Sequence, residues 1–166
     1  MRKYYKMILV LMVSLCNTSV VLSAQEVDRM KYSRDVNGVE VGIILTRNFV
    51  VANFGEPTRY EEQDSGDNGV NRWYYYGDSY IHTKDHVFDE FAVSDTVFAA
   101  FTNQIPGGLK VGDPLSKLDN FKYGKPVQYR DFEDCLVYSL FDTTDSPVDL
   151  YVKDGIIVDI TYHDPM

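Results

Sequence analysis

The feature that most constrains how this chain can fold is a short pattern that occurs twice. Residues 38–42 read Gly-Val-Glu-Val-Gly, and residues 108–112 read Gly-Leu-Lys-Val-Gly. Residues 55–60 read Gly-Glu-Pro-Thr-Arg-Tyr, and residues 124–129 read Gly-Lys-Pro-Val-Gln-Tyr. The two copies keep the same order, which is typical of an internal duplication.

A third block supports this interpretation. Apolar residues alternate with other residues along 91–101 and again along 150–160. The separation between copies shortens by about ten residues before this block, so we expect the first copy to carry about ten extra residues between positions 60 and 87. Three blocks in one order make duplication the better explanation than chance.

Each copy begins with the signals of a short helix. In the first copy, Thr46 is a suitable N-cap, residues 49–54 are mostly apolar, and Gly55 can end the helix. In the second copy, Asp113 is the expected N-cap and Gly124 the expected end. Helices this short depend on packing rather than on intrinsic propensity.

Strand signals follow each helix. The aromatic run at 72–76 and the apolar run at 136–141 each predict a strand, and the alternating blocks at 91–101 and 150–160 each predict a hairpin. The polar stretch 61–71 is predicted to be a loop. The sequence therefore predicts an α+β fold of two tandem repeats, each a short helical element packed on an antiparallel β-sheet.

This interpretation divides the chain into five parts. They are a signal peptide (1–24), an N-terminal segment (25–37), repeat 1 (38–103), a linker (104–107) and repeat 2 (108–166).

The signal peptide is predicted from the order of charges and apolar residues. Arg2, Lys3 and Lys6 precede an apolar run at 7–15, which is too short to cross a membrane. Cleavage after Ala24 would release a periplasmic or secreted chain without a membrane span. As an alternative, the residues before Cys16 resemble a lipobox, which would give a chain that is lipid-anchored at Cys16.

The charge balance narrows the class of partner. The chain has 25 Asp and Glu against 16 Lys and Arg, and removal of residues 1–24 leaves a net charge of about −12. This balance excludes nucleic acid, whose binders need a basic surface. It is compatible with a basic protein partner, although solubility alone would also explain it.

No catalytic or metal-binding pattern stands out. His82, Asp85, His86 and Asp89 are close in sequence, but their spacing would converge only on a helix, and this stretch does not have helical periodicity. Cys135 remains as a single cysteine after cleavage and has an acidic neighbour, which disfavours a reactive thiolate. The sequence therefore predicts no cofactor, no metal site and no catalytic residue.

The repeated motif resembles the beta-lactamase-inhibitor-protein-like fold. The resemblance rests on a Gly before a short helix, the Gly-Glu-Pro or Gly-Lys-Pro that follows, a strand with Trp and Tyr, and a closing hairpin over residues 38–163. Small outer-membrane assembly lipoproteins share this motif in a single copy. The resemblance implies a binding module outside the cytoplasm. The inhibitor's disulfides cannot form here.

Period-two alternation points to a binding surface. Alternation in the two hairpin blocks places Phe98 and Tyr151 on the face of the sheet opposite the helices. If Trp73 and Tyr75 face the helices, Tyr74 and Tyr76 join that face, as aromatic residues of an interface would. The alternative is that the two repeats cover these residues.

The expected function is therefore an exported, non-catalytic protein-binding module, such as an inhibitor or immunity-type partner of another envelope or secreted protein. The alternative is a small secreted or periplasmic hydrolase with an unidentified site.

Overall fold

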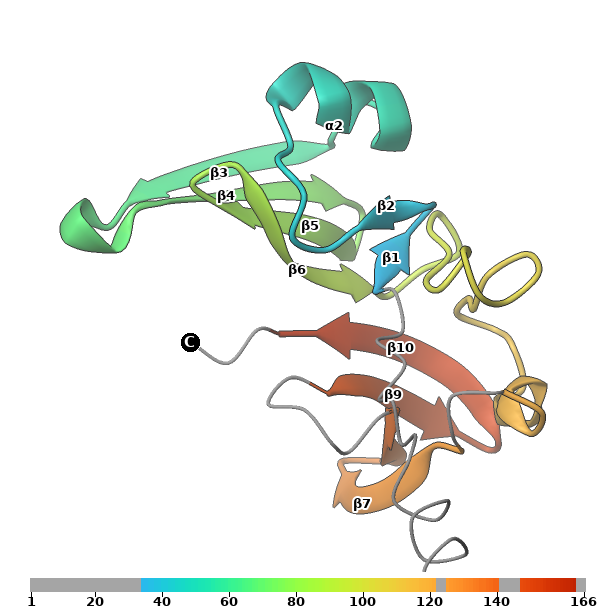
Figure 1. Ribbon diagram of the computed structural model, residues 1–166. Helices are drawn as coiled ribbons and strands as arrows, with labels where there is room; N and C mark the ends of the chain where they lie inside the picture. The colour runs from blue at the N-terminus through green and yellow to red at the C-terminus, as the bar shows by residue number, and fades with distance from the viewer. Residues whose placement is uncertain (1–33, 122–124, 141–146, 164–166) are drawn as a thin grey trace, which may run out of the picture. The chain divides into compact units, whose positions relative to one another are not determined.

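One eight-stranded antiparallel sheet organises the computed structural model, which describes residues 34–121, 125–140 and 147–163 (Figure 1). The strand order is β3-β4-β5-β6-β10-β9-β8-β7. Two four-stranded meanders therefore meet through their last strands. The sheet strands are β3 (Arg59–Asp64), β4 (Val70–Tyr76), β5 (Ser79–Lys84), β6 (Val87–Val93), β7 (Val127–Phe132), β8 (Cys135–Leu140), β9 (Val148–Lys153) and β10 (Ile156–Tyr162).

The helical elements are few and short. The α-helix α2 (Arg47–Phe54) begins as predicted, because the Thr46 hydroxyl accepts a hydrogen bond from the Phe49 amide at 3.3 Å. It ends at Gly55, whose φ of 86° is the left-handed region that favours glycine. The 3₁₀ turns η1 (Gly66–Asn68) and η2 (Leu115–Leu118) complete the set among the described residues. A short helix with antiparallel sheet agrees with the predicted α+β class.

The second predicted helix is only the turn η2, and Asp113 does not cap it. The Asp113 carboxylate instead accepts a hydrogen bond from the Lys110 amide at 2.8 Å and pairs with the Lys117 ammonium at 2.8 Å. Because the side chain is used on the preceding turn, η2 starts at Pro114 without a side-chain cap. Gly124 lies outside the described residues.

Of the two predicted hairpins, one is confirmed and one is wrong. The β9–β10 hairpin turns through Asp154 and Gly155, both with positive φ, as an Asp-Gly turn requires. In the first half, β6 ends at Val93 and pairs with β5 and β10, so residues 97–101 form no strand. A φ of 56° at Phe101 interrupts extended backbone there.

The polar stretch 61–71 is also not a single loop. Residues 61–64 belong to β3 and β4 begins at Val70, so only residues 65–69 connect the two strands. The reason is the environment of β3, which is an edge strand with every residue exposed. Without a buried face, its sequence has no apolar alternation to reveal it.

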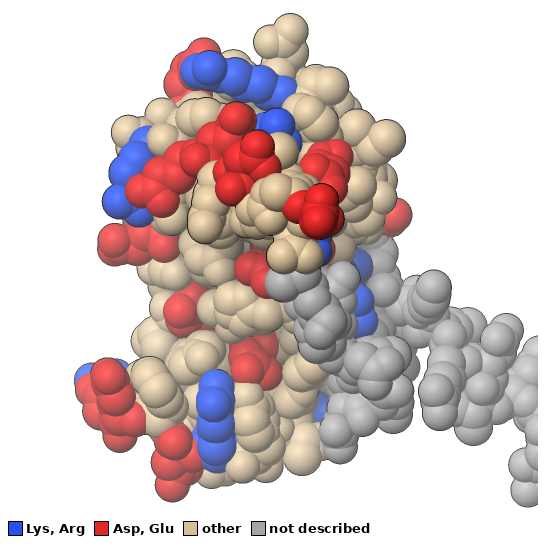
Figure 2. Space-filling view, turned by 90° about the vertical axis from the view of Figure 1, so that its left-hand side faces the viewer, with Lys and Arg blue, Asp and Glu red and all other residues tan. Residues whose placement is uncertain are grey.

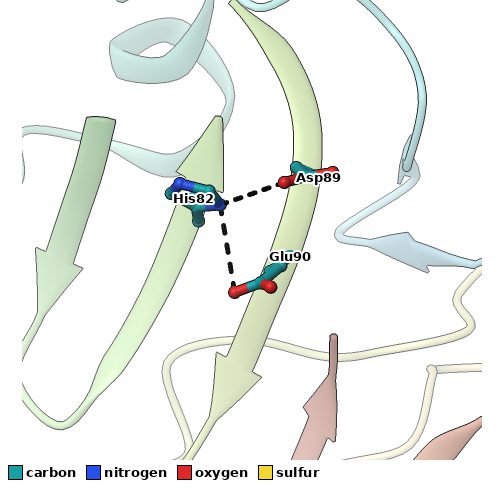
Figure 3. Close-up of side chains that lie close together, drawn as sticks. All are labelled: His82, Asp89 and Glu90. Carbon is teal, nitrogen blue, oxygen red and sulfur yellow. Dashed lines mark ion pairs between the residues drawn. The ribbon is translucent and has the colours of Figure 1, made fainter. Parts of the chain in front are cut away.

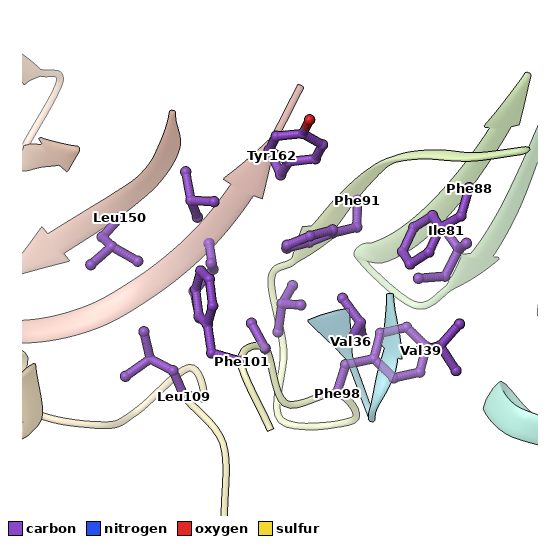
Figure 4. Close-up of a cluster of buried hydrophobic side chains, with 14 of the residues drawn as sticks. Val36, Val39, Ile81, Phe88, Phe91, Phe98, Phe101, Leu109, Leu150 and Tyr162 are labelled. Carbon is purple, nitrogen blue, oxygen red and sulfur yellow. The ribbon is translucent and has the colours of Figure 1, made fainter. Parts of the chain in front are cut away.

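The core lies on the face of the sheet that α2 covers. Buried side chains run across five strands in register, from Tyr74 through Ile81, Phe91 and Tyr162 to Val148. Figure 4 shows Ile81 and Phe91 of the first meander and Tyr162 of the second in the same cluster. A single core therefore joins the two meanders.

The short strands β1 (Asp35–Val36) and β2 (Val39–Glu40) close the end of this core. The Asp35 carboxylate is buried and accepts hydrogen bonds from the amides of Gly38, Thr102 and Asn103 at 3.1, 2.9 and 3.2 Å. This anchors the β1–β2 turn to residues 99–103.

Within the described ranges, no helix has the length and apolar character to cross a membrane.

We expect Phe91→Ala to destabilise the protein by about 3–5 kcal/mol, because Phe91 is fully buried at the junction between the meanders. Urea unfolding followed by circular dichroism measures this. The matched control is Val97→Ala, which is 59% exposed and should change the unfolding free energy by less than about 0.5 kcal/mol. Equal effects of the two substitutions would contradict the core as described.

Candidate functional site

Three of the four predicted binding residues lie in the core. Tyr74, Tyr76 and Phe98 are 1%, 5% and 1% exposed. Tyr76 packs edge-on against Phe98 at 4.9 Å and lies 6.5 Å from Phe54 of α2, and its hydroxyl donates to the Gly55 carbonyl at 3.1 Å. The prediction that these side chains face away from the helix is therefore wrong.

The physical reason is the phase of β4. The run 72–76 has four aromatic residues in a row, and its polar residue, Arg72, alternates in phase with the buried Tyr74 and Tyr76, so alternation does not reveal which side is buried. Trp73 and Tyr75, not their neighbours, point away from α2. We call this side of the sheet the distal face. The side chains of Trp73, His82, Glu90 and Tyr151 lie on this face.

Tyr151 does lie on the distal face, where it belongs to a group that we call the aromatic–arginine cluster: Tyr129, Arg130, Phe132 and Tyr151. The Phe132 and Tyr151 rings meet edge-on at 5.8 Å. The Arg130 guanidinium lies 5.2 Å from the Tyr129 ring centre and 5.9 Å from that of Phe132, and 3.4 Å from the Tyr151 hydroxyl. Tyr129 and Phe132 remain 49% and 47% exposed.

Asp149 supports this cluster from β9, the strand that also carries Tyr151. The Tyr129 hydroxyl donates to Asp149 Oδ2 at 2.5 Å, and Arg130 lies 3.7 Å from the same oxygen. Burial, followed by this hydrogen bond to a carboxylate, raises the pKa of Tyr129 to about 12. The phenol therefore stays protonated and remains a donor across the physiological pH range.

A second group of polar residues lies further along the distal face. His82 of β5 lies beside Asp89 and Glu90 of β6, with its Nδ1 atom 3.4 Å from Asp89 Oδ2 and 3.9 Å from Glu90 Oε2 (Figure 3). These three residues are close enough to hold a metal ion together. Burial lowers the pKa of His82, although Glu90 acts in the opposite direction.

The sequence predicted no metal site here. It had associated His82 and Asp89 with Asp85 and His86, but the Asp85 carboxylate accepts a hydrogen bond from the Val70 amide at 2.9 Å. Glu90 was missed because its approach to His82 depends on strand register. A hairpin centred on the Asp85-His86 turn is the signal that would have brought β5 and β6 together.

Cys135 has the properties of a poor nucleophile. Burial, and then the adjacent Asp134 carboxylate, raise the pKa of its thiol, and the sulfur lies 3.7 Å from Asp134 Oδ1. Among the residues described, neither His82 nor His163 has a hydrogen bond to a Ser, Thr or Cys side chain; their partners are Asn71 and carboxylates.

Comparisons with known proteins add little. No family model matches the chain, and no curated protein matches it. Among solved structures, the chain is similar to YjgB, a DUF4309 family protein from Bacillus subtilis, with 14% identity and a TM-score of 0.37 over 77% of this chain and 83% of that chain. A likeness this weak carries no argument about fold or function. The resemblance to beta-lactamase-inhibitor-like proteins stays a prediction.

We expect Cys135 to react more slowly with iodoacetamide at pH 8 than free cysteine does, because a raised pKa lowers the thiolate fraction. Asp134→Asn should accelerate the reaction several-fold, since it removes a negative charge beside the sulfur. Both measurements use a Cys16→Ser background, so that one thiol is observed. A Cys135 that reacts faster than free cysteine would contradict this account and favour a nucleophilic role.

Proposed function

We propose that this chain is an exported, non-catalytic protein-binding module that uses the aromatic–arginine cluster as its contact surface. One observation carries the proposal. At one edge of the sheet, the half-exposed rings of Tyr129 and Phe132 lie on either side of the Arg130 guanidinium. Tyr and Arg are enriched among the residues that dominate protein–protein binding energies.

The position of the cluster also supports binding. Strand β7 is an edge strand, and all six of its residues are exposed. An exposed edge offers unpaired backbone groups to an extended segment of another protein, while the neighbouring side chains provide specificity. This region therefore offers a partner both an exposed strand edge for backbone hydrogen bonds and aromatic side chains for contact.

Charge indicates the chemistry of the partner. The chain has a formal net charge of −9, and acidic side chains occupy more of the face in Figure 2 than basic ones. Next to the cluster, Asp131, Glu133 and Asp134 follow one another closely along β7 and its turn. A partner with a basic surface would be attracted to this region, and the rate of association would fall with salt.

The remaining parts of the proposal come from the sequence. The signal peptide predicted at 1–24 supports a periplasmic or secreted location, with a lipid anchor at Cys16 as the alternative. The repeated motif, together with the mirrored order of the two meanders, supports a tandem repeat like that of the inhibitor proteins. A protein partner of inhibitor or immunity type fits such a module.

The test is capture of a partner from envelope extracts of the native host, followed by affinity measurements with the purified partner. Phe132→Ala and Tyr151→Ala should each weaken binding by about 2 kcal/mol, or roughly 30-fold, because each removes an aromatic anchor. The affinity should also fall as salt is raised.

The matched control is Tyr60→Ala. Tyr60 is 37% exposed, but it pairs in register with Tyr74 and so lies on the opposite face. This variant should bind like the parent chain. If Phe132→Ala and Tyr151→Ala fold normally and also bind like the parent chain, the contact surface is elsewhere and the proposal fails.

A further inference from the structure

A β-bulge brings two consecutive acidic residues to the same histidine. In the β5–β6 pair, His82 lies opposite Glu90 and Thr83 lies opposite Phe88, so Asp89 is an extra residue on β6. In a regular strand, Asp89 and Glu90 would point to opposite faces. A bulge changes the direction in which a side chain points, and here the carboxylates of Asp89 and Glu90 both approach the His82 ring (Figure 3).

The His82 ring is held in one orientation by its other neighbours. Asn71 Nδ2 lies 3.3 Å from Ser65 Oγ, which leaves Asn71 Oδ1 facing His82 Nε2 at 3.2 Å. Since Oδ1 can only accept, Nε2 carries the proton. Trp73 stacks on the same ring at 4.7 Å, with 28° between the planes. These contacts leave the Nδ1 lone pair directed at the carboxylates.

One buried atom of this arrangement has no hydrogen-bond partner. His82 is 5% exposed, and its Nδ1 atom is buried without a hydrogen-bond partner. Two carboxylate oxygens lie 3.4 and 3.9 Å from it, and they are acceptors too. A buried lone pair facing two anionic oxygens is unfavourable unless a cation lies between them.

The spacing suits a metal ion. At metal–ligand distances of about 2.0–2.2 Å, ligand atoms at the corners of a tetrahedron lie roughly 3.4 Å apart. The Nδ1–Asp89 distance has this value. All three ligand atoms, one each from His82, Asp89 and Glu90, lie within 4.8 Å of one another. The Asn71 contact is the outer hydrogen bond that metal-ligating histidines commonly make.

We propose that His82 Nδ1 and the carboxylates of Asp89 and Glu90 bind a divalent first-row transition-metal ion such as Zn²⁺. Imidazole nitrogen with carboxylate oxygen suits Zn²⁺ and its neighbours, whereas Mg²⁺ and Ca²⁺ prefer sets of oxygen ligands. This site is separate from the aromatic–arginine cluster and does not depend on the proposed function.

Calorimetric titration of the untagged, metal-free full chain with Zn²⁺ tests the proposal. We expect one equivalent to bind, with no comparable heat from Mg²⁺. The isosteric changes Asp89→Asn and Glu90→Gln should each weaken Zn²⁺ binding at least tenfold, because each removes an anionic ligand. Glu61→Gln is the matched control, since Glu61 lies on the same face in register with Trp73, three strands from Glu90. It should leave the affinity unchanged.

A second measurement needs no variant. Trp73 is the only tryptophan of the chain and stacks on His82, so its fluorescence reports on this site alone. Zn²⁺ should change the emission until one equivalent is bound, and EDTA should reverse the change. The proposal is overturned if Zn²⁺ gives no saturable heat or fluorescence change. It is also overturned if folded Asp89→Asn and Glu90→Gln variants bind Zn²⁺ like the parent chain.

Discussion

The antiparallel pairing of β6 with β10 is the interaction on which the rest of the structure depends. It comprises three residue pairs, Val93 with Ile160, Ala92 with Thr161 and Phe91 with Tyr162. On the side covered by α2, the Phe91 and Tyr162 rings meet at 5.8 Å and join the apolar side chains of both meanders into one cluster. Neither four-stranded meander alone would bury these rings. We call this three-pair junction between β6 and β10 the seam; it supports a single core.

The same seam makes the distal face continuous. Across it, Ala92 and Thr161 stand between Tyr80 of the first meander and Asp149 of the second. The histidine–carboxylate group and the aromatic–arginine cluster thus lie on one surface, although they come from different meanders. Two chemically distinct groups on one sheet are compatible with the proposed module, which would bind a partner at one position and a cation at another.

Local signals in the sequence predicted local features well. Thr46 and Gly55 bound α2, and the Asp154-Gly155 turn closes its hairpin, because caps and tight turns depend on a few adjacent residues. Features that depend on distant pairing were missed. The aromatic run of β4 has its polar residue, Arg72, in phase with Tyr74 and Tyr76, and these two tyrosines were placed on the wrong face. The hairpin turn at Asp85-His86 could have paired β5 with β6, but the bulge that brings Asp89 as well as Glu90 to His82 depends on the register of that pair.

Cysteine cross-linking across the seam tests most directly whether β6 and β10 form one continuous distal face. Ala92→Cys with Thr161→Cys, in a Cys16→Ser and Cys135→Ser background, places two thiols at paired positions on neighbouring strands. The hairpin pair Tyr80→Cys with Ala92→Cys is the positive control, since both residues belong to the first meander. We expect both pairs to form a disulfide in the folded protein under mild oxidation. Cross-linking of the control pair alone would contradict the seam, and with it the shared core and the continuous surface.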